Sequence, residues 1–392
     1  MAGAAGTRGG IDPKAMLAEG YERVRREYGA AIGRPRVDLV TPALVLDLPA
    51  AKRNIAKMAS RIQELPSEIR PHIKVHKSPE LARLQVEAGA IGLSTATVWE
   101  AIVLVHSGLD HILLVNTVAG PAKIRAVAEL AGEADLMIAV DDLSNIDALS
   151  DAVTAAGNQL GVLVEVDTGM DRAGADSVEE AVGLARRVAD RPGLNLLGVT
   201  GYEGHCSNTP DHDERLVKER SAMGFLLEVA EAFEHHGLPC PVRSAGGTAT
   251  WDWTAAFPGI TEIQAGTYVV MDNFHGAMVG GFEHSLTVQA TVVSRRPDRV
   301  IVDAGNKTVG AGDIASIEGH PLRPFRFDEE HGIFDATAGS TLKLGDVVRL
   351  VPGYSPSTVN WFDAFHIVDD DVVVDIWPVI PRGPGHHGLV AG

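Results

Sequence analysis

Short apolar runs alternate with helical patterns from about residue 41 to about residue 250. Between the runs, apolar residues recur at helical spacing, as Ile55, Met58 and Ile62 do, and this spacing builds one face of a helix. A strand followed by a helix, repeated eight times, is typical of a (β/α)8 barrel, with a doubly wound open sheet as the alternative. The expected barrel strands are residues 43–48, 70–75, 90–94, 111–115, 136–140, 160–166, 195–201 and 241–246.

Cap residues mark the ends of several expected helices. One helix follows Asp47, and another begins with Ser78 as the N-cap and Pro79 at the first helical position, then ends at Gly89. A long helix is expected over residues 213–236.

The pattern changes after the barrel. A ninth apolar run at residues 261–266 exceeds the count of eight and is expected to lead out of the barrel. Beyond about residue 280 the chain is rich in Val, Ile and Thr with turn signals, which predicts a β-rich domain. The sequence therefore predicts an N-terminal extension (1–40) with a helix at 14–31, a barrel (41–275) and a C-terminal β-rich domain (276–392).

Charge and composition narrow the class of protein. The net charge of −18 argues against nucleic-acid and anionic-membrane partners, because both require a basic surface. Two cysteines, Cys206 and Cys240, are too few for a disulfide framework and fit a reducing compartment. The sequence shows no secretory signal at its start and no run of 18 apolar residues. We expect a cytoplasmic protein that acts on a small molecule.

Residues 70–80, "RPHIKVHKSPE", contain the first candidate for chemistry. Strand alternation places His72, Lys74 and His76 on one side, and catalytic residues of a barrel lie at the C-terminal ends of its strands. A lysine that points into the barrel mouth loses solvent, which favours the neutral amine required for a Schiff base. Lys77 precedes the helix cap and is expected at the rim. The alternative is that both lysines are surface charges.

Three further motifs follow expected strands. "RSAGGTAT" contains Gly246 and Gly247, whose backbone N–H groups could hold a phosphate, although most Gly-Gly pairs are only turns. "EVDTGMDRAG" contains Arg172, which points into the barrel mouth or pairs with a surface aspartate. "GYEGHCSN" contains Tyr202 and His205, which strand position places on the same face of the site. The alternative is that Tyr202 is a core residue and His205 a loop residue. Polar groups that converge on one end of a barrel indicate a binding site.

Together these motifs resemble the pyridoxal-phosphate enzymes of the alanine-racemase fold, and within them the D-threonine aldolase and D-serine dehydratase family. The matching stretches also include "TPALVLDL", "TEIQAGTYVVMD", "VDAGNK", "DEEHG" and "WPVIPRG", so that the resemblance spans residues 41–383. It implies a barrel followed by a β domain, a pyridoxal phosphate cofactor and a homodimer.

The resemblance also implies roles for individual residues. Lys74 would form the internal aldimine with the cofactor, Arg172 would contact its phenolic oxygen, and Tyr202 would lie by the pyridine nitrogen. The turn at Gly246, Gly247 and Thr248 would hold the cofactor's phosphate, with Tyr268 nearby. The full set of candidate cofactor-binding residues is Lys74, His72, Arg172, Tyr202, Ser244, Gly246, Gly247, Thr248 and Tyr268.

One position departs from the family pattern. The family has a metal-binding His-x-Asp or His-x-Cys pair after "LVPG", where this chain has Tyr354 and Pro356. Proline offers no side-chain ligand and a neutral tyrosine is a poor one. The resemblance therefore implies that the usual divalent metal site is absent, and that Tyr354 or His205 acts as general acid or base.

The expected function is aldol cleavage of a D-β-hydroxy amino acid through a Lys74 aldimine. β-Elimination, as in D-serine or hydroxyaspartate dehydratases, and metal-independent racemisation or epimerisation are the alternatives. A pyridoxal-phosphate homeostasis protein without turnover is a non-enzymatic alternative, and the C-terminal β domain argues against it. A cofactor-free Schiff-base aldolase is a further reading.

Overall fold

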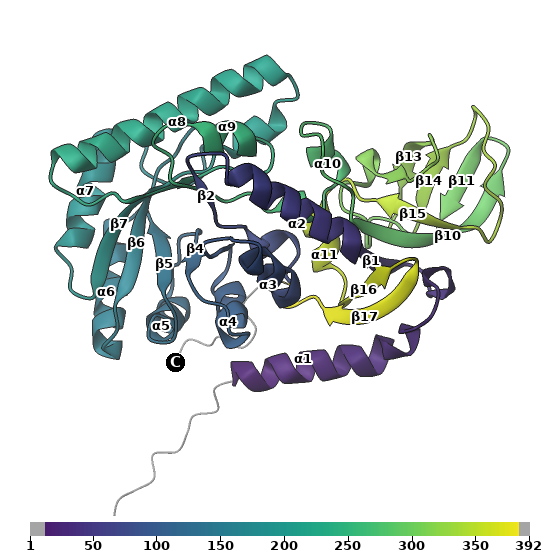
Figure 1. The fold of residues 1–392 in the computed structure, drawn as a ribbon, viewed down its shortest axis with the longest axis horizontal. Helices are drawn as coiled ribbons and strands as arrows, with labels where there is room; N and C mark the ends of the chain where they lie inside the picture. Colours follow the sequence, from purple (N-terminus) through teal and green to yellow (C-terminus); the bar gives the residue numbers. More distant parts are fainter. Residues whose placement is uncertain (1–11, 384–392) are drawn as a thin grey trace, which may run out of the picture.

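The structure is a computed structural model that describes residues 12–383. Its larger part is built around eight short parallel strands (Figure 1). Their order is β2-β9-β8-β7-β6-β5-β4-β3, and a bridge between His72 and Ser94 links the two ends into a ring. This is the predicted (β/α)8 barrel. Its strands are β2 (Glu68–Ile69), β3 (Leu93–Thr95), β4 (Ile112–Leu114), β5 (Leu136–Val140), β6 (Leu160–Glu165), β7 (Leu194–Thr200), β8 (Val242–Ala245) and β9 (Glu262–Ile263).

Helices follow the barrel strands and cover the outside of the ring (Figure 1). The predicted cap at Ser78 is confirmed, because its hydroxyl accepts a hydrogen bond from the backbone N–H of Leu81 at 3.2 Å. The predicted long helix is α8. The barrel helices are α3 (Pro79–Glu87), α4 (Val98–His106), α5 (Pro121–Leu130), α6 (Leu143–Ala156), α7 (Val178–Ala189), α8 (His212–His235) and α9 (Trp251–Ala256).

Three strand assignments from the sequence pattern are wrong. The run at 43–48 forms β1 (Ala43–Asp47), which pairs with strands of the second sheet, and the supposedly surplus run at 261–266 supplies the eighth barrel strand. The run at 70–75 does not form the expected strand. The strand β2 ends at Ile69, just before the run, and Ile73–Val75 form the 3-10 helix η3. A short apolar run looks the same in the sequence whichever sheet it joins. The predicted number of eight barrel strands was therefore right, although the run at 43–48 was wrongly included and the run at 261–266 wrongly left out.

The second part of the molecule is a nine-stranded, mainly antiparallel sheet that contains β1. Its order is β13-β14-β11-β10-β1-β16-β17, and β15 pairs with β10 and β12. The strands are β10 (Leu286–Arg296), β11 (Arg299–Val302), β12 (Ser316–Ile317), β13 (Arg323–Phe327), β14 (Gly332–Asp335), β15 (Val347–Val351), β16 (Ala364–Asp369) and β17 (Val372–Pro378).

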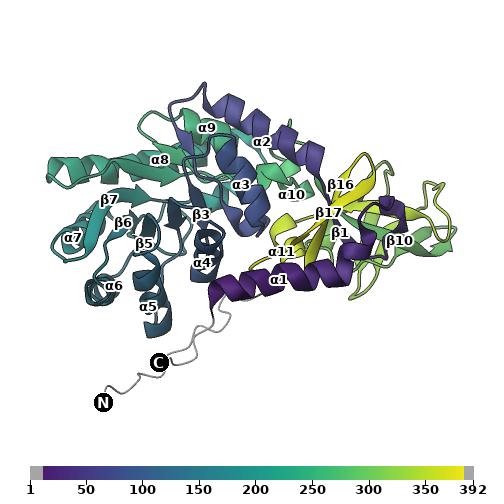
Figure 2. The same ribbon diagram turned by 60° about the horizontal axis from the view of Figure 1, so that its bottom comes forward.

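The predicted N-terminal helix is α1 (Pro13–Tyr28), which contacts both α4 and β17 and runs along the boundary between the two parts (Figure 2). Leu17 and Val24 are its buried residues. The remaining elements are α2 (Leu48–Ile62), α10 (Asn273–Gly276), α11 (Ser355–Asn360) and the 3-10 turns η1 (Gly29–Ala31), η2 (Arg36–Asp38), η4 (Gly204–Asn208), η5 (Thr267–Val269) and η6 (Gly312–Ile314).

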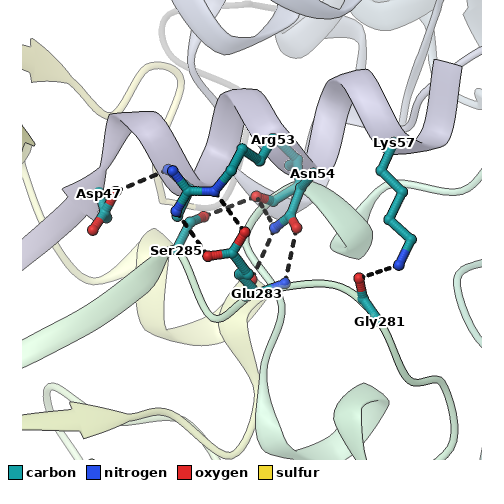
Figure 3. Close-up of polar contacts among 9 residues, drawn as sticks. Asp47, Arg53, Asn54, Lys57, Gly281, Glu283 and Ser285 are labelled. Atoms are coloured by element: carbon teal, nitrogen blue, oxygen red, sulfur yellow. Dashed lines mark hydrogen bonds and ion pairs between the residues drawn. The ribbon is translucent and has the colours of Figure 1, made fainter. Parts of the chain in front are cut away.

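Helix α2 holds the segment that leads from the barrel to the second sheet (Figure 3). The Asn54 side chain accepts a hydrogen bond from the backbone N–H of Glu283 and donates to its carbonyl, both at 2.8 Å. Arg53 binds the Glu283 carboxylate through two nitrogens, each at 2.8 Å, and Lys57 donates to the carbonyl of Gly281. These contacts fix the crossing point between the two parts of the chain.

Within residues 12–383, no helix combines the length and the apolar character needed to cross a membrane.

Candidate active site

A cavity opens at the C-terminal ends of the barrel strands. Its walls come from loops that follow β2, β4, β6, β7, β8 and β9, together with His275 of α10 and two residues from the second part of the chain. Eight of the residues predicted from the sequence line it: His72, Lys74, Arg172, Tyr202, Gly246, Gly247, Thr248 and Tyr354. The structure therefore brings most of the predicted site together.

Lys74 lies in η3, directly after the first barrel strand rather than the second as the sequence pattern suggested. Its Nζ atom is 5.5 Å from the centre of the Tyr202 ring. Burial lowers the pKa of Lys74 from its ordinary value, the Arg172 guanidinium lowers it further, and Glu100 opposes both. A lowered pKa raises the share of neutral amine, which is the nucleophilic form.

The structure corrects the prediction for Lys77, which is buried and does not lie at the rim. Its Nζ atom forms an ion pair with Oε1 of the buried Glu100 at 2.9 Å. The other carboxylate oxygen of Glu100 accepts a hydrogen bond from the backbone N–H of Ala96. The two lysines of "KVHK" therefore differ in kind: Lys74 faces the cavity, whereas Lys77 is neutralised behind it.

Arg172 pairs with Glu165, the last residue of β6, rather than with a surface aspartate. Its Nη2 atom is 3.6 Å from Oε1 of Glu165, and its guanidinium lies 5.9 Å from the centre of the Tyr202 ring. The Asp167 carboxylate instead accepts hydrogen bonds from backbone N–H groups, including those of Gly169 and Arg172. The turn is thus closed by Asp167, which leaves the Arg172 side chain free to reach the cavity.

Glu165 lines the cavity and was not singled out from the sequence. Burial raises its pKa to about 7, nearby Asp141 and Asp167 raise it as well, and Arg172 opposes them. Its Oε2 atom is buried without a hydrogen-bond partner in the described chain. A carboxylate at the C-terminal end of a barrel strand is the signal that could have identified it.

The turn at Gly246 and Gly247 lies against Tyr202. Gly246 has φ of 83°, and a Cβ atom on Gly247 would lie 2.9 Å from the Tyr202 ring, so both positions require glycine. The backbone N–H of Gly246 donates to Oε2 of Glu203 at 3.2 Å. The hydroxyl of Thr248, by contrast, is buried and has no partner within residues 12–383. An acceptor in the cavity, such as a phosphate oxygen, would satisfy it.

Three predicted residues do not line the cavity. Ser244 lies behind it and accepts a hydrogen bond from Gln264, which does line it. The Tyr268 hydroxyl is bonded to Gln85, and its ring borders a separate cavity beside α2 and α3. His205 packs against Gly169 and is not among the residues that line the cavity. Residue type and strand position alone could not show which way these side chains turn.

Tyr354 precedes α11 and stands beside His275 on the cavity wall. The two rings are stacked with centres 6.1 Å apart and an angle of 19° between their planes. Burial raises the pKa of the Tyr354 phenol, and the nearby Asp272 carboxylate raises it further. Pro356 also lines the cavity. Across residues 12–383, no group of three or more His, Cys, Asp or Glu side chains is arranged to hold a metal ion.

Comparison with known proteins places the chain in a family. The family described as "Alanine racemase, N-terminal domain" matches residues 46–273, and the one described as "Putative serine dehydratase domain" matches residues 285–368.

Curated relatives and a solved structure cover nearly the whole chain. A D-threonine aldolase from Arthrobacter sp is 37% identical over 90% of this chain and 95% of its own length. A 3-hydroxy-D-aspartate aldolase from Paracoccus denitrificans is 32% identical over 94% of this chain and 98% of its own length. The crystal structure of D-threonine aldolase from Filomicrobium marinum superposes with a TM-score of 0.87 at 34% identity, covering 90% of this chain and 98% of that one. The chain therefore belongs to the D-threonine aldolase and D-serine dehydratase family with the alanine-racemase-type fold.

Proposed function

We propose that this protein is a pyridoxal-phosphate-dependent lyase that cleaves a D-configured β-hydroxy amino acid into glycine and an aldehyde. The observation that carries the proposal is the position of Lys74, a lysine of lowered pKa in the same cavity as the Gly246–Gly247 turn. The relatives named as D-threonine aldolase and 3-hydroxy-D-aspartate aldolase support aldol cleavage over other reactions of the fold.

The cavity residues fit pyridoxal phosphate. The unpartnered hydroxyl of Thr248 beside the glycine turn suits a phosphate oxygen, and the Tyr202 ring contacts that turn and lies 5.5 Å from the Lys74 amine. The Arg172 guanidinium lies 5.9 Å from the centre of the same ring, and this position supports the expected contact with the phenolic oxygen. When bound, the cofactor supplies an electron sink for the electron pair left on Cα of the substrate.

Lys74 has two tasks in this proposal. Its neutral Nζ atom is the nucleophile that holds the cofactor, and the lowered pKa makes this form more abundant. Once the substrate amine has taken its place, the freed Nζ atom can move a proton at Cα.

The β-hydroxyl must be handled by side chains at the mouth of the cavity. Tyr354 and Pro356 stand where the family pattern has its metal-binding pair, and both line the cavity. The raised pKa of Tyr354 keeps its phenol protonated at neutral pH, so it can donate a hydrogen bond to the substrate oxygen. We propose that Tyr354 contacts the β-hydroxyl in this way and that no divalent metal is needed.

The alternatives use the same cavity differently. β-Elimination requires protonation of the leaving hydroxyl, whereas racemisation or epimerisation requires only exchange of the α-proton. A cofactor-storage protein without turnover requires no side chains from the second part of the chain, and the position of Tyr354 on the cavity wall argues against it.

Product analysis separates these functions. Purified protein loaded with pyridoxal phosphate is incubated with D-threonine and D-phenylserine, and glycine, aldehyde and 2-oxo acid are measured. We expect glycine and aldehyde, together with visible absorbance of the bound cofactor that Lys74→Ala removes. Release of 2-oxo acid would favour the dehydratase, and α-proton exchange alone in D₂O would favour the racemase.

Treatment with a chelator tests metal independence. We expect aldehyde release to persist after EDTA treatment and gel filtration, because the side chains at positions 354 and 356 are poor metal ligands. Loss of activity with EDTA and recovery with Mn²⁺ would contradict this part of the proposal.

A further inference from the structure

His275 is held in one orientation by Asp272, the residue that caps α10. Its backbone N–H donates to Oδ1 of Asp272 at 2.9 Å, and its Nδ1 lies 2.8 Å from the same oxygen. The second oxygen of Asp272 accepts a hydrogen bond from the backbone N–H of Ser355 at 2.8 Å. One carboxylate therefore fixes both the histidine and the start of α11, which follows Tyr354.

This contact determines which ring nitrogen carries the proton. A carboxylate accepts hydrogen bonds, so Nδ1 of His275 must be the N–H donor, and Nε2 is left with a lone pair in the neutral ring. The ring stacks on Tyr354 and meets the edge of Phe274, which restricts its rotation. His275 is part of the cavity wall, and Nε2 is the ring nitrogen that can accept a proton.

Two other histidines near the site lack this arrangement. The Nδ1 atom of His72 accepts a hydrogen bond from the backbone N–H of Lys74, and burial holds the pKa of His72 well below its ordinary value. His205, which the sequence suggested as an acid or base, is not part of the cavity wall.

We propose that His275 is the catalytic base for the β-hydroxyl of the substrate, with Asp272 as its positioning residue and Tyr354 as a hydrogen-bond donor beside it. This inference rests on the proposed aldol cleavage. Nε2 of His275 takes the hydroxyl proton, and the O–H electron pair becomes the second bond of the aldehyde carbonyl. The Cα–Cβ bond breaks, its electron pair stays on Cα, and Cα is then protonated to give glycine. The proton on His275 returns to solvent.

The first test compares two reactions of the loaded enzyme. Aldehyde release from D-threonine requires the base, whereas α-proton exchange of D-alanine in D₂O does not, because D-alanine has no β-hydroxyl. We expect His275→Gln to lower aldehyde release by about 10²- to 10⁴-fold, the usual contribution of a general base, and to leave exchange and cofactor absorbance unchanged. His284→Gln, an exposed histidine nine positions later, is the matched control and is expected to behave as wild type.

The outcomes separate the two proposals. Wild-type protein that neither releases aldehyde nor exchanges the α-proton would overturn the proposed function and this inference with it. Aldehyde release that is normal in His275→Gln, or lost in His205→Gln instead, would overturn the role of His275 alone. If His275→Gln loses its cofactor, His275→Ala is used, and recovery of aldehyde release with added imidazole is the expected result. Failure of imidazole to restore it would count against the base.

A second readout does not depend on activity. Protein labelled with ¹⁵N at histidine is examined by NMR, and the His275 signals are assigned by their absence from His275→Gln. We expect the Nδ1–H tautomer in wild-type protein and a shift toward the Nε2–H tautomer in Asp272→Asn. A predominant Nε2–H tautomer in wild-type protein would overturn the proposed orientation.

Discussion

Lys77 and Glu100 form a buried ion pair three residues beyond the cavity lysine. The side chains are 9% and 1% exposed, so water screens neither charge. Such a pair is costly to break on one side, because the remaining charge stays buried without a partner. Lys74 by contrast has a lowered pKa and faces the cavity. Of these two nearby lysines, Lys77 therefore stabilises the fold, whereas Lys74 is available for chemistry in the cavity.

Substitution of Lys77 should weaken folding without removing the cofactor. We expect Lys77→Met to lower the free energy of unfolding by about 3–5 kcal/mol, the usual cost of leaving one buried charge unpaired, as measured by urea denaturation. Visible absorbance of the bound cofactor should persist. Lys52→Met, at an exposed position of α2, is the control. A loss of less than about 1 kcal/mol would match an exposed ion pair and contradict the burial of Lys77.

Glu219 links stability to pH. Burial raises its pKa to about 7, and the neighbouring Glu203 carboxylate adds to the effect. The unfolded chain releases this proton near pH 4.5, whereas the folded chain keeps it until about pH 7. The folded state thus binds more protons between these values, and the contribution of Glu219 to stability falls as pH rises through this window.

We expect Glu219→Gln to remove this part of the pH dependence. The difference in the free energy of unfolding between variant and wild type should grow in favour of the variant from pH 5 to pH 8. Glu228→Gln, an exposed position on the same helix, should show no such trend. Urea denaturation at four pH values measures the effect, and parallel curves for wild type and Glu219→Gln would contradict it.

At the scale of elements, local signals were predicted well and the choice of sheet was not. The start of α3 at Ser78 and the long helix α8 follow from caps and spacing, which are properties of nearby residues. The assignment of β1 failed because its partners, β10 and β16, lie more than 200 residues away in the sequence. An apolar run contains no information about a partner so distant.

The same limit applies to the site. Lys74 and the glycine turn were found because each sits at a strand end with a distinctive residue type. His275 was missed because nothing in the sequence around it marks a strand end or a site, and only the fold shows that it is held by Asp272 and lines the cavity. Tyr268 was included because of the family resemblance, yet its hydroxyl turns toward Gln85.

The link between α2 and the segment before β10 should matter for stability. Asn54 is 2% exposed, and its amide satisfies the backbone N–H and carbonyl of Glu283 (Figure 3). The same amide donates a hydrogen bond to the carbonyl of Val269. We expect Asn54→Ala to lower the free energy of unfolding by about 2–4 kcal/mol, because each buried group left unpaired costs about 1–3 kcal/mol. Arg53→Ala, which breaks an exposed ion pair in the same segment, should change stability little. Equal effects of the two would contradict the assigned role of Asn54.

At the scale of the whole molecule, the chain crosses between its two parts more than once. β1 lies between β10 and β16 in the second sheet, and α2 begins at the next residue and contacts the barrel strand β2. Helix α1 contacts both β17 and α4. The cavity itself is lined by barrel loops and by Tyr354, which lies between strands of the second sheet in the sequence. Neither part is complete without segments held by the other.

We therefore expect the two parts to unfold together. Loss of the second sheet would release β1, withdraw support from α1 and α2, and open the cavity, so no stable barrel intermediate should accumulate. Circular dichroism in the far ultraviolet and visible absorbance of the bound cofactor should give coincident thermal transitions, which is the signature of one cooperative unit. Because the family resemblance predicts a homodimer, the measurement is made at two protein concentrations, and the midpoint should rise with concentration. A first transition that removes part of the circular dichroism signal while the cofactor stays bound would show that the barrel is stable by itself and contradict this expectation.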